Sequence, residues 1–133
     1  MADLKEVAQQ NINAFNAHDA NAVAALAHSE VVASAPNPTG RSELRGREAV
    51  KEYNQSWFEG FPDAKIMLTN QVIVGNYIVQ EGTFDGTNTG TFKTAAVDLP
   101  ATGRHLRGHY AQVSNLSNGA VVSTRLYFDQ VGT

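Results

Sequence analysis

Residues 106–131 read LRGHYAQVSNLSNGAVVSTRLYFDQV, and this stretch decides the fold class. It holds two long runs rich in β-branched and aromatic residues, about 106–116 and 120–131, which favour β-strands. Asn118-Gly119 separates the runs. Because both residues tolerate positive φ, this pair is the strongest hairpin signal in the chain. We therefore predict a long antiparallel hairpin here.

A second hairpin of the same kind is predicted upstream. Residues 65–74 and 76–84 are again rich in strand-forming residues, and Gly75-Asn76 lies at the turn between them. Residues 85–103 separate the two hairpins and are predicted to form irregular loops rich in glycine and threonine.

The N-terminal part of the chain shows helical periodicity instead. Apolar residues recur three and four apart over residues 4–15, 23–27 and 50–61, which predicts a first helix, a short second helix and a third that begins at Arg47. Asp3 and Asp19 are expected to cap the first two helices, and His18-Asp19 is interpreted as turn and cap chemistry. A short strand is expected at 31–35, and the two prolines of residues 36–40 are expected to break the chain into a lip over a pocket.

The order of elements, helices first and antiparallel strands last, predicts the architecture. Long hairpins need one face covered, and the N-terminal helices are the available cover. The 133 residues are 42% hydrophobic and 17% charged, which suits one folded domain over residues 1–133. The predicted fold class is therefore α+β, with N-terminal helices packed on a curved antiparallel sheet.

Composition and charge exclude several classes of function. The net charge is −3 and the basic residues are scattered, which argues against a nucleic-acid partner. Cysteine is absent, so disulfides and thiol nucleophiles are excluded. No stretch approaches the roughly 20 apolar residues of a membrane span, and MADLKEVAQQ at the start lacks the pattern of a signal peptide. We therefore expect a cytoplasmic protein that binds neither nucleic acid nor membrane.

Four motifs occur in a family-like order: GREAV at 46–50, GTNTG at 86–90, ATGR at 101–104 and RLYFDQVG at 125–132. With them the whole chain resembles the SnoaL-like polyketide cyclases, a branch of the nuclear transport factor 2-like superfamily. The resemblance implies a cone-shaped α+β barrel with a pocket between the long helix and the concave face of the sheet. It also implies an intramolecular aldol reaction without a cofactor, and a homodimer. An aspartate on the family's last strand acts as general acid or base, and Asp129 stands at the matching position.

Asp129 is therefore the first candidate for a reacting group. A carboxylate has an ordinary pKa of about 4, and burial would raise that pKa toward the operating pH. His109 is the candidate partner, depending on the register of the last hairpin. A strict two-residue loop places Gly108 opposite Asp129 and turns His109 away. A three-residue loop or a bulge places Arg107 opposite Asp129 and puts His109 on the same face.

Ligand contacts are expected from aromatic side chains and from two departures from the family pattern. Asn88 stands where many relatives carry a histidine, and Arg125 stands where many carry a tryptophan. Arg125, Tyr127 and Asp129 are two apart along one strand, so they share a face, and a pocket arginine favours an anionic or carbonyl-bearing ligand. The expected ligand-contacting residues are Phe15, Tyr53, Trp57, Tyr77, Asn88, Arg125 and Tyr127.

The histidines do not predict a metal site. His105 and His109 lie four apart on a predicted strand, which separates same-face side chains by about 13 Å. Two histidines that far apart cannot share one ion, and no other cluster has metal-ligand spacing. We therefore expect no metal, and the resemblance to the cyclases implies that no cofactor is used.

Three functions stay open at this point. The first is a cofactor-free lyase or isomerase that acts on a small, mostly apolar carbonyl compound, with Asp129 as the acid or base. The second is an epoxide-hydrolase-like enzyme, for which Arg125 and Asp129 are candidates for two of the three residues; the third is not evident, and Glu81 is a candidate substitute. The third is a non-catalytic module that binds an apolar small molecule, which the absent loop histidine favours. On the alternate face of the last strand, a homodimer surface is offered by Val122, Leu126 and Phe128.

Overall fold

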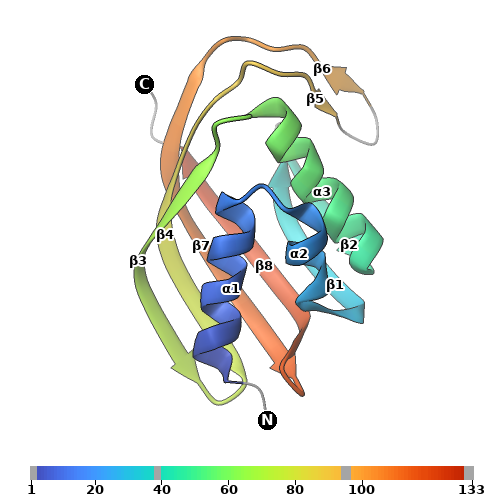
Figure 1. Ribbon diagram of the computed structural model, residues 1–133, viewed down its shortest axis with the longest axis vertical. Helices are drawn as coiled ribbons and strands as arrows, with labels where there is room; N and C mark the ends of the chain where they lie inside the picture. The colour runs from blue at the N-terminus through green and yellow to red at the C-terminus, as the bar shows by residue number, and fades with distance from the viewer. Residues whose placement is uncertain (1–2, 38–39, 94–96, 131–133) are drawn as a thin grey trace.

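The computed structural model describes residues 3–37, 40–93 and 97–130, and its elements are labelled in Figure 1. The helices within these ranges are α1 (Leu4–Asn16), α2 (Ala20–Ala25) and α3 (Arg47–Gly60). The strands are β1 (Ala27–Asn37), β2 (Gly40–Arg45), β3 (Lys65–Val74), β4 (Tyr77–Thr87), β5 (Phe92–Lys93), β6 (Asp98–Leu99), β7 (His105–Ser117) and β8 (Ala120–Gln130).

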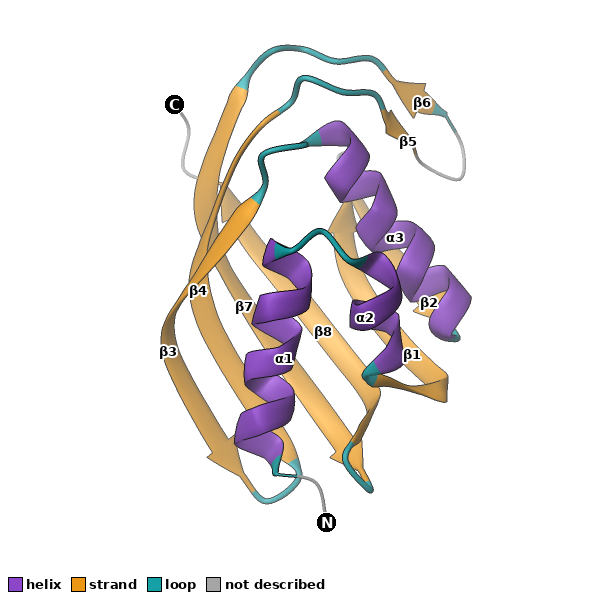
Figure 2. Ribbon diagram, viewed as in Figure 1, coloured by secondary structure: helices purple, strands orange, loops and turns teal. Residues whose placement is uncertain are grey.

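Six of the strands form one curved sheet in the order β2-β1-β8-β7-β4-β3. Neighbouring strands are antiparallel except β1 and β8, which run parallel, so the sheet is mixed where a purely antiparallel sheet was expected. The three helices lie on one side of the sheet, within its curve, and the short ribbon of β5 and β6 lies beyond one end of α3 (Figure 2). The predicted α+β class, with N-terminal helices covering a curved sheet, is confirmed.

The region of β1 and β2 differs from the sequence prediction. β1 is longer than the expected strand at 31–35, and β2 was not predicted at all. Pro36 lies near the end of β1 and pairs with Arg41 of β2, the edge strand, where the hairpin is about to turn. A proline is tolerated there because strand ends and edges leave N–H positions unused. Residues 38–39 of the predicted lip lie outside the described residues.

The capping predictions are confirmed. The carboxylates of Asp3 and Asp19 each accept a backbone N–H bond at 3.0 Å from the first turn of the helix that follows. His18 turns the corner between α1 and α2 with a φ of 56°. Its Nε2 lies 2.7 Å from the carbonyl oxygen of Ala64, and its ring stacks on Phe58 with centroids 4.6 Å apart. His18 therefore has a structural role at the corner.

The two predicted hairpins are present with the predicted turns. Asn118 and Gly119 both have positive φ, 51° and 79°, in the two-residue loop between β7 and β8. Gly75 has a φ of 58° in the turn between β3 and β4. Positive φ at these positions matches the twist of the flanking strands, which is why these residue types predicted the turns.

A β-bulge follows the last turn. Leu116 pairs with Val121, but the next pair along is Asn115 with Ser123, so Val122 is an extra residue on β8. A bulge of this kind shifts the register by one residue and exchanges the faces of every side chain beyond it.

The shifted register places His109 directly opposite Asp129. Both registers considered from the sequence are therefore wrong, because the extra residue lies on β8 while the loop keeps two residues. The two side chains do share one face of the sheet.

Small side chains occupy part of the layer between helices and sheet. Four buried alanines face the space there: Ala8 on α1 and Ala27, Ala33 and Ala35 on β1. Larger residues gather at its two ends, around Ile78 and Leu116 at one and around Phe61, Phe84 and Phe92 at the other. Small residues fill space poorly, so this arrangement leaves room between the layers.

None of the helices in the described ranges has the length and apolar character that crossing a bilayer requires.

Candidate functional site

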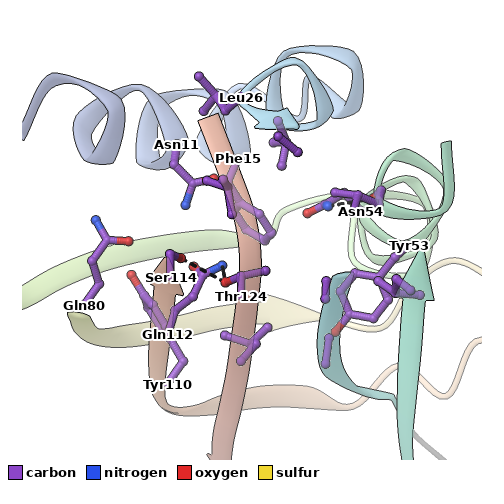
Figure 3. A pocket seen from close by; sticks show the side chains of 18 of the residues that line it. Asn11, Phe15, Leu26, Tyr53, Asn54, Gln80, Tyr110, Gln112, Ser114 and Thr124 are labelled. Carbon is purple, nitrogen blue, oxygen red and sulfur yellow. Dashed lines mark hydrogen bonds between the residues drawn. The ribbon is translucent and has the colours of Figure 1, made fainter. Parts of the chain in front are cut away.

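A cavity of about 150 Å³ lies between the helices and the concave face of the sheet. Its wall on the helical side includes Phe15 from α1 and Tyr53, Asn54 and Trp57 from α3. Figure 3 shows Tyr53 and Asn54 facing a group of polar side chains that stand on the sheet. Most of the remaining lining is aliphatic.

The polar group on the sheet is centred on β7. Tyr110, Gln112 and Ser114 alternate along this strand and all line the cavity, because residues two apart point to the same face. Their cross-strand partners are Gly82, Gln80 and Ile78 on β4 and Phe128, Leu126 and Thr124 on β8.

Two hydrogen bonds link the members of this group. Gln112 Nε2 donates to Thr124 Oγ1 at 3.0 Å, and the hydroxyls of Ser114 and Thr124 lie 2.9 Å apart (Figure 3). On β4, Gln80 Nε2 donates to Gln71 Oε1 at 2.9 Å. These bonds hold the polar side chains of the sheet against one another.

The lining of the cavity is uncharged. Among the described residues, no Asp, Glu, Lys, Arg or His lines it, and the ionisable side chains present there are Tyr53 and Tyr110. Burial raises the pKa of Tyr110 to about 12 and raises that of Tyr53 as well. Both phenols are therefore protonated at neutral pH and act as hydrogen-bond donors.

The two phenols differ in what they bind. Tyr53 donates its hydroxyl to the carbonyl oxygen of Pro36 at 2.5 Å, which ties α3 to the end of β1. The hydroxyl of Tyr110 is buried and has no hydrogen-bond partner in the described part of the chain. The indole N–H of Trp57 is also buried without one.

Some of the residues expected to contact a ligand line the cavity. Phe15, Tyr53 and Trp57 do so, although their contact with a ligand stays a prediction. Tyr77 does not, because it lies at the start of β4 with half of its surface (50%) exposed. Glu81 is also exposed, and its carboxylate accepts a hydrogen bond from Asn70 at 3.0 Å.

Asp129 and His109, the expected catalytic pair, lie on the outer face of the sheet. Both are exposed, neither lines the cavity, and they pair across β7 and β8. The expectation that they face the pocket is therefore corrected. The physical reason is the bulge at Val122, which sends the charged positions of β8 to solvent and the apolar positions inward.

The rest of β8 follows the same alternation. Arg125 and Tyr127 are exposed on the outer face, where the guanidinium of Arg41 lies 4.8 Å above the centre of the Tyr127 ring. Leu126 and Phe128 line the cavity, so they cannot form the expected dimer surface. Homodimerisation itself stays a prediction.

Asn88 has a structural position outside the cavity lining. Its side-chain N–H groups donate to the carbonyls of Gly60 at 2.9 Å and Gly90 at 3.0 Å. Its side-chain oxygen accepts from the backbone N–H and the hydroxyl of Thr102, both at 2.9 Å. Asn88 thus joins the end of α3 to the loops before β5 and before β7, and it holds the GTNTG and ATGR stretches together.

The sequence reasoning missed the residues that shape the polar side of the cavity: Gln80, Tyr110, Gln112, Ser114 and Thr124. A signal was available in the alternation of residues 123–128, where Thr, Leu and Phe share one face and Ser, Arg and Tyr the other. The more apolar face of a one-sided sheet packs on the core, which selects the face that the structure shows.

No group of three or more His, Cys, Asp or Glu side chains within residues 3–37, 40–93 and 97–130 is placed to hold a metal ion. The neutral lining of the cavity offers amide, hydroxyl and indole groups, which suit hydrogen bonding to an uncharged ligand.

Comparison with solved structures defines the class of fold. A nuclear transport factor 2-like protein of unknown function from Burkholderia pseudomallei K96243 is 19% identical, with a TM-score of 0.77 over 97% of this chain and 92% of that one. A protein from Catenulispora acidiphila with a ketosteroid isomerase-like fold, solved in complex with trimethylamine, is 14% identical, with a TM-score of 0.76 over 93% and 85%. The fold is therefore nuclear transport factor 2-like.

The family follows from the sequence. The profile of the SnoaL-like polyketide cyclases matches residues 5–133, so the chain belongs to this family. A protein from Jannaschia sp. CCS1 classed as a SnoaL-like polyketide cyclase is 19% identical, with a TM-score of 0.79 over 95% of this chain and 85% of that one. None of the curated protein sequences matches the chain.

Proposed function

We propose that this protein binds a neutral, mostly apolar small molecule in the cavity between its helices and sheet. The observation that carries the proposal is the uncharged lining, in which amide and hydroxyl groups stand among aliphatic and aromatic side chains. A buried charge without a partner is costly, and the described lining offers a charged ligand no opposite charge to offset its loss of hydration.

The volume of the cavity limits the size of the ligand. A dry cavity of about 150 Å³ binds benzene in an engineered protein, whereas drug-sized ligands occupy about 300–1,000 Å³. The cavity here has about 150 Å³. We therefore propose a ligand with a single ring, or a short chain of similar bulk.

Ring closure or isomerisation of a bound carbonyl compound is the second candidate, and membership of the cyclase family favours it. With no carboxylate or imidazole in the described lining, such a reaction relies on other effects. The cavity holds the reacting atoms close together, a water molecule or hydroxide ion from solvent takes the proton that leaves the carbon, and the free hydroxyl of Tyr110 donates to the developing oxygen anion. An epoxide-hydrolase mechanism has no support, because Arg125 and Asp129 lie on the outer face.

Binding is tested by titrating the protein with uncharged and charged ring compounds and following its amide NMR signals. Toluene and phenol are expected to shift signals of cavity residues, and benzoate and benzylammonium are not. Binding of benzoate with the affinity of toluene would contradict the neutral site.

A matched pair of variants locates the binding. Ala33 lines the cavity, whereas Ala111 lies between the inward-facing Tyr110 and Gln112 on β7 and does not. Ala33→Leu adds three carbon atoms to the cavity and is expected to weaken toluene binding, while Ala111→Leu leaves it unchanged. Equal effects of the two substitutions would place the ligand elsewhere.

A further inference from the structure

The hydroxyl of Tyr110 stands out as an unused hydrogen-bond donor. The residue is only 6% exposed, and its oxygen has no partner in the described part of the chain. A buried hydroxyl without a hydrogen bond destabilises the folded state, and such groups in native proteins call for an explanation. Phenylalanine would fill the same space without that penalty.

The position of the Tyr110 ring is set by its neighbour on β4. Gly82 pairs with Tyr110, and a Cβ at Gly82 would lie 2.6 Å from Cε2 and 2.8 Å from the hydroxyl oxygen of Tyr110. The ring therefore lies across β4 in space that only a glycine leaves open. The same Cβ would meet the carbonyl oxygen of Met67 at 2.3 Å, which is backbone and cannot move aside.

Gln80 supplies an unused acceptor close to this donor. Its Nε2 donates to Gln71 Oε1 at 2.9 Å and to the carbonyl oxygen of Ala8 at 3.4 Å. A backbone carbonyl only accepts, so the amide orientation is fixed and Oε1 is the free atom. Both hydrogen bonds of the side chain use Nε2, which leaves Oε1 available to a donor in the cavity that Gln80 lines.

The donor and the acceptor are diagonal neighbours on the concave face. Gln80 precedes Gly82, the partner of Tyr110, by two residues on β4, and diagonal pairs of long side chains are within reach of each other. Figure 3 shows Gln80, Tyr110 and Gln112 together on the sheet side of the cavity. Of the other polar groups on this face, Gln112 donates its Nε2 to Thr124, and the hydroxyls of Ser114 and Thr124 bond to each other.

We propose that Tyr110 and Gln80 form a recognition pair for a ligand hydroxyl group, which donates to Gln80 Oε1 and accepts from Tyr110. A hydroxyl carries both a donor and acceptor lone pairs, so it satisfies both groups at once, whereas a ketone satisfies only Tyr110. The ligand class is a neutral monocyclic phenol or alcohol. The Tyr110 oxygen is covered, so contact requires a small rotation of the ring or its neighbours. The inference rests on the proposed binding function.

The test compares ligands that differ only in a hydroxyl, namely phenol against toluene and cyclohexanol against methylcyclohexane. A net hydrogen bond is equivalent to about five- to tenfold in affinity. Wild-type protein should therefore bind the hydroxylated member of each pair at least about fivefold more tightly. Tyr110→Phe should reduce that preference by about fivefold while the toluene affinity stays unchanged.

Tyr77→Phe is the matched control, because Tyr77 lies outside the cavity lining with half of its surface exposed. It should leave the preference for phenol intact. Tyr110→Phe should unfold at the wild-type temperature or higher, since it removes no internal bond.

The outcomes separate the two proposals. Equal affinities for phenol and toluene in the wild type, or an unchanged preference in Tyr110→Phe, overturn the recognition pair while binding in the cavity stands. A lower melting temperature for Tyr110→Phe overturns it too, because it reveals a structural partner. Failure of the wild type to bind any of the four compounds overturns the proposed function, and the recognition pair with it. The ligand comparison needs no variant to fold.

Discussion

Replacing Asn88 by alanine should destabilise the protein strongly although Asn88 lies outside the cavity lining. The side chain is 9% exposed and makes four hydrogen bonds of 2.9–3.0 Å to Gly60, Gly90 and Thr102. Alanine removes all four and leaves two carbonyls, an N–H and a hydroxyl without these partners. Gly90 approaches α3 so closely that a Cβ there would lie 1.9 Å from the carbonyl oxygen of Glu59, so the loop has little freedom to compensate.

The expected cost follows from the bonds lost. Each hydrogen bond contributes about 0.5–1.5 kcal/mol net, and bonds that share one side chain are not additive, so we expect a loss of about 3 kcal/mol. At about 4 °C for each kcal/mol in a domain of this size, the melting temperature should fall by about 12 °C. Such a loss is a large part of the stability of a small domain.

Urea denaturation followed by circular dichroism measures this loss directly. Thr89→Ala is the control, because Thr89 is exposed in the same loop and should change the free energy of unfolding by less than about 0.5 kcal/mol. A double-mutant cycle with Thr102→Val should give a coupling energy of about 1 kcal/mol between the two side chains. A loss below about 1 kcal/mol for Asn88→Ala would refute the structural role.

Two further substitutions test charged residues outside the cavity. Asp63 accepts a hydrogen bond from the backbone N–H of Thr87 at 2.7 Å, and this bond lowers the pKa of the Asp63 carboxyl. A lowered folded-state pKa contributes stability above about pH 4 that is lost as the pH falls through the folded value. The stability advantage of wild type over Asp63→Asn should therefore shrink between pH 6 and pH 3 in urea titrations, and a constant difference would contradict it. Asp129 is exposed on the outer face. Asp129→Asn should therefore leave the toluene affinity unchanged and alter the free energy of unfolding by less than about 0.5 kcal/mol. Weaker toluene binding by this variant would show that the carboxylate reaches the cavity.

Local signals in the sequence predicted the helices and hairpins well. Helical periodicity, the caps at Asp3 and Asp19, and the turn at Asn118-Gly119 all depend on residues close together in the chain. β2 was missed because its residues, GRSELR, carry no strong strand pattern and follow two prolines. Pairing with β1 holds these residues in a strand although their own preference for strand conformation is weak.

The site was harder to predict because its residues meet only through strand register. Family resemblance correctly indicated the fold, yet it directed attention to Asp129 on the face that the bulge turns outward. The alternation of apolar and polar residues along β8 alone favours Leu126 and Phe128 as the inward-facing positions. In the structure both residues line the cavity. The sequence cannot reveal that the Tyr110 hydroxyl lacks a hydrogen-bond partner, because this depends on which groups surround the ring in the folded protein.

Val122 decides which face of the last strand meets the cavity. If the same chain paired without the bulge, the two-residue turn would place Asp129 opposite the inward-facing Gly108, and the carboxylate would point into the cavity. One sequence is therefore compatible with a neutral lining when the bulge is present and with an acidic lining when it is absent, while the order of the strands stays the same. On this scaffold, a change of chemistry is separated from a change of architecture by the pairing of a single residue.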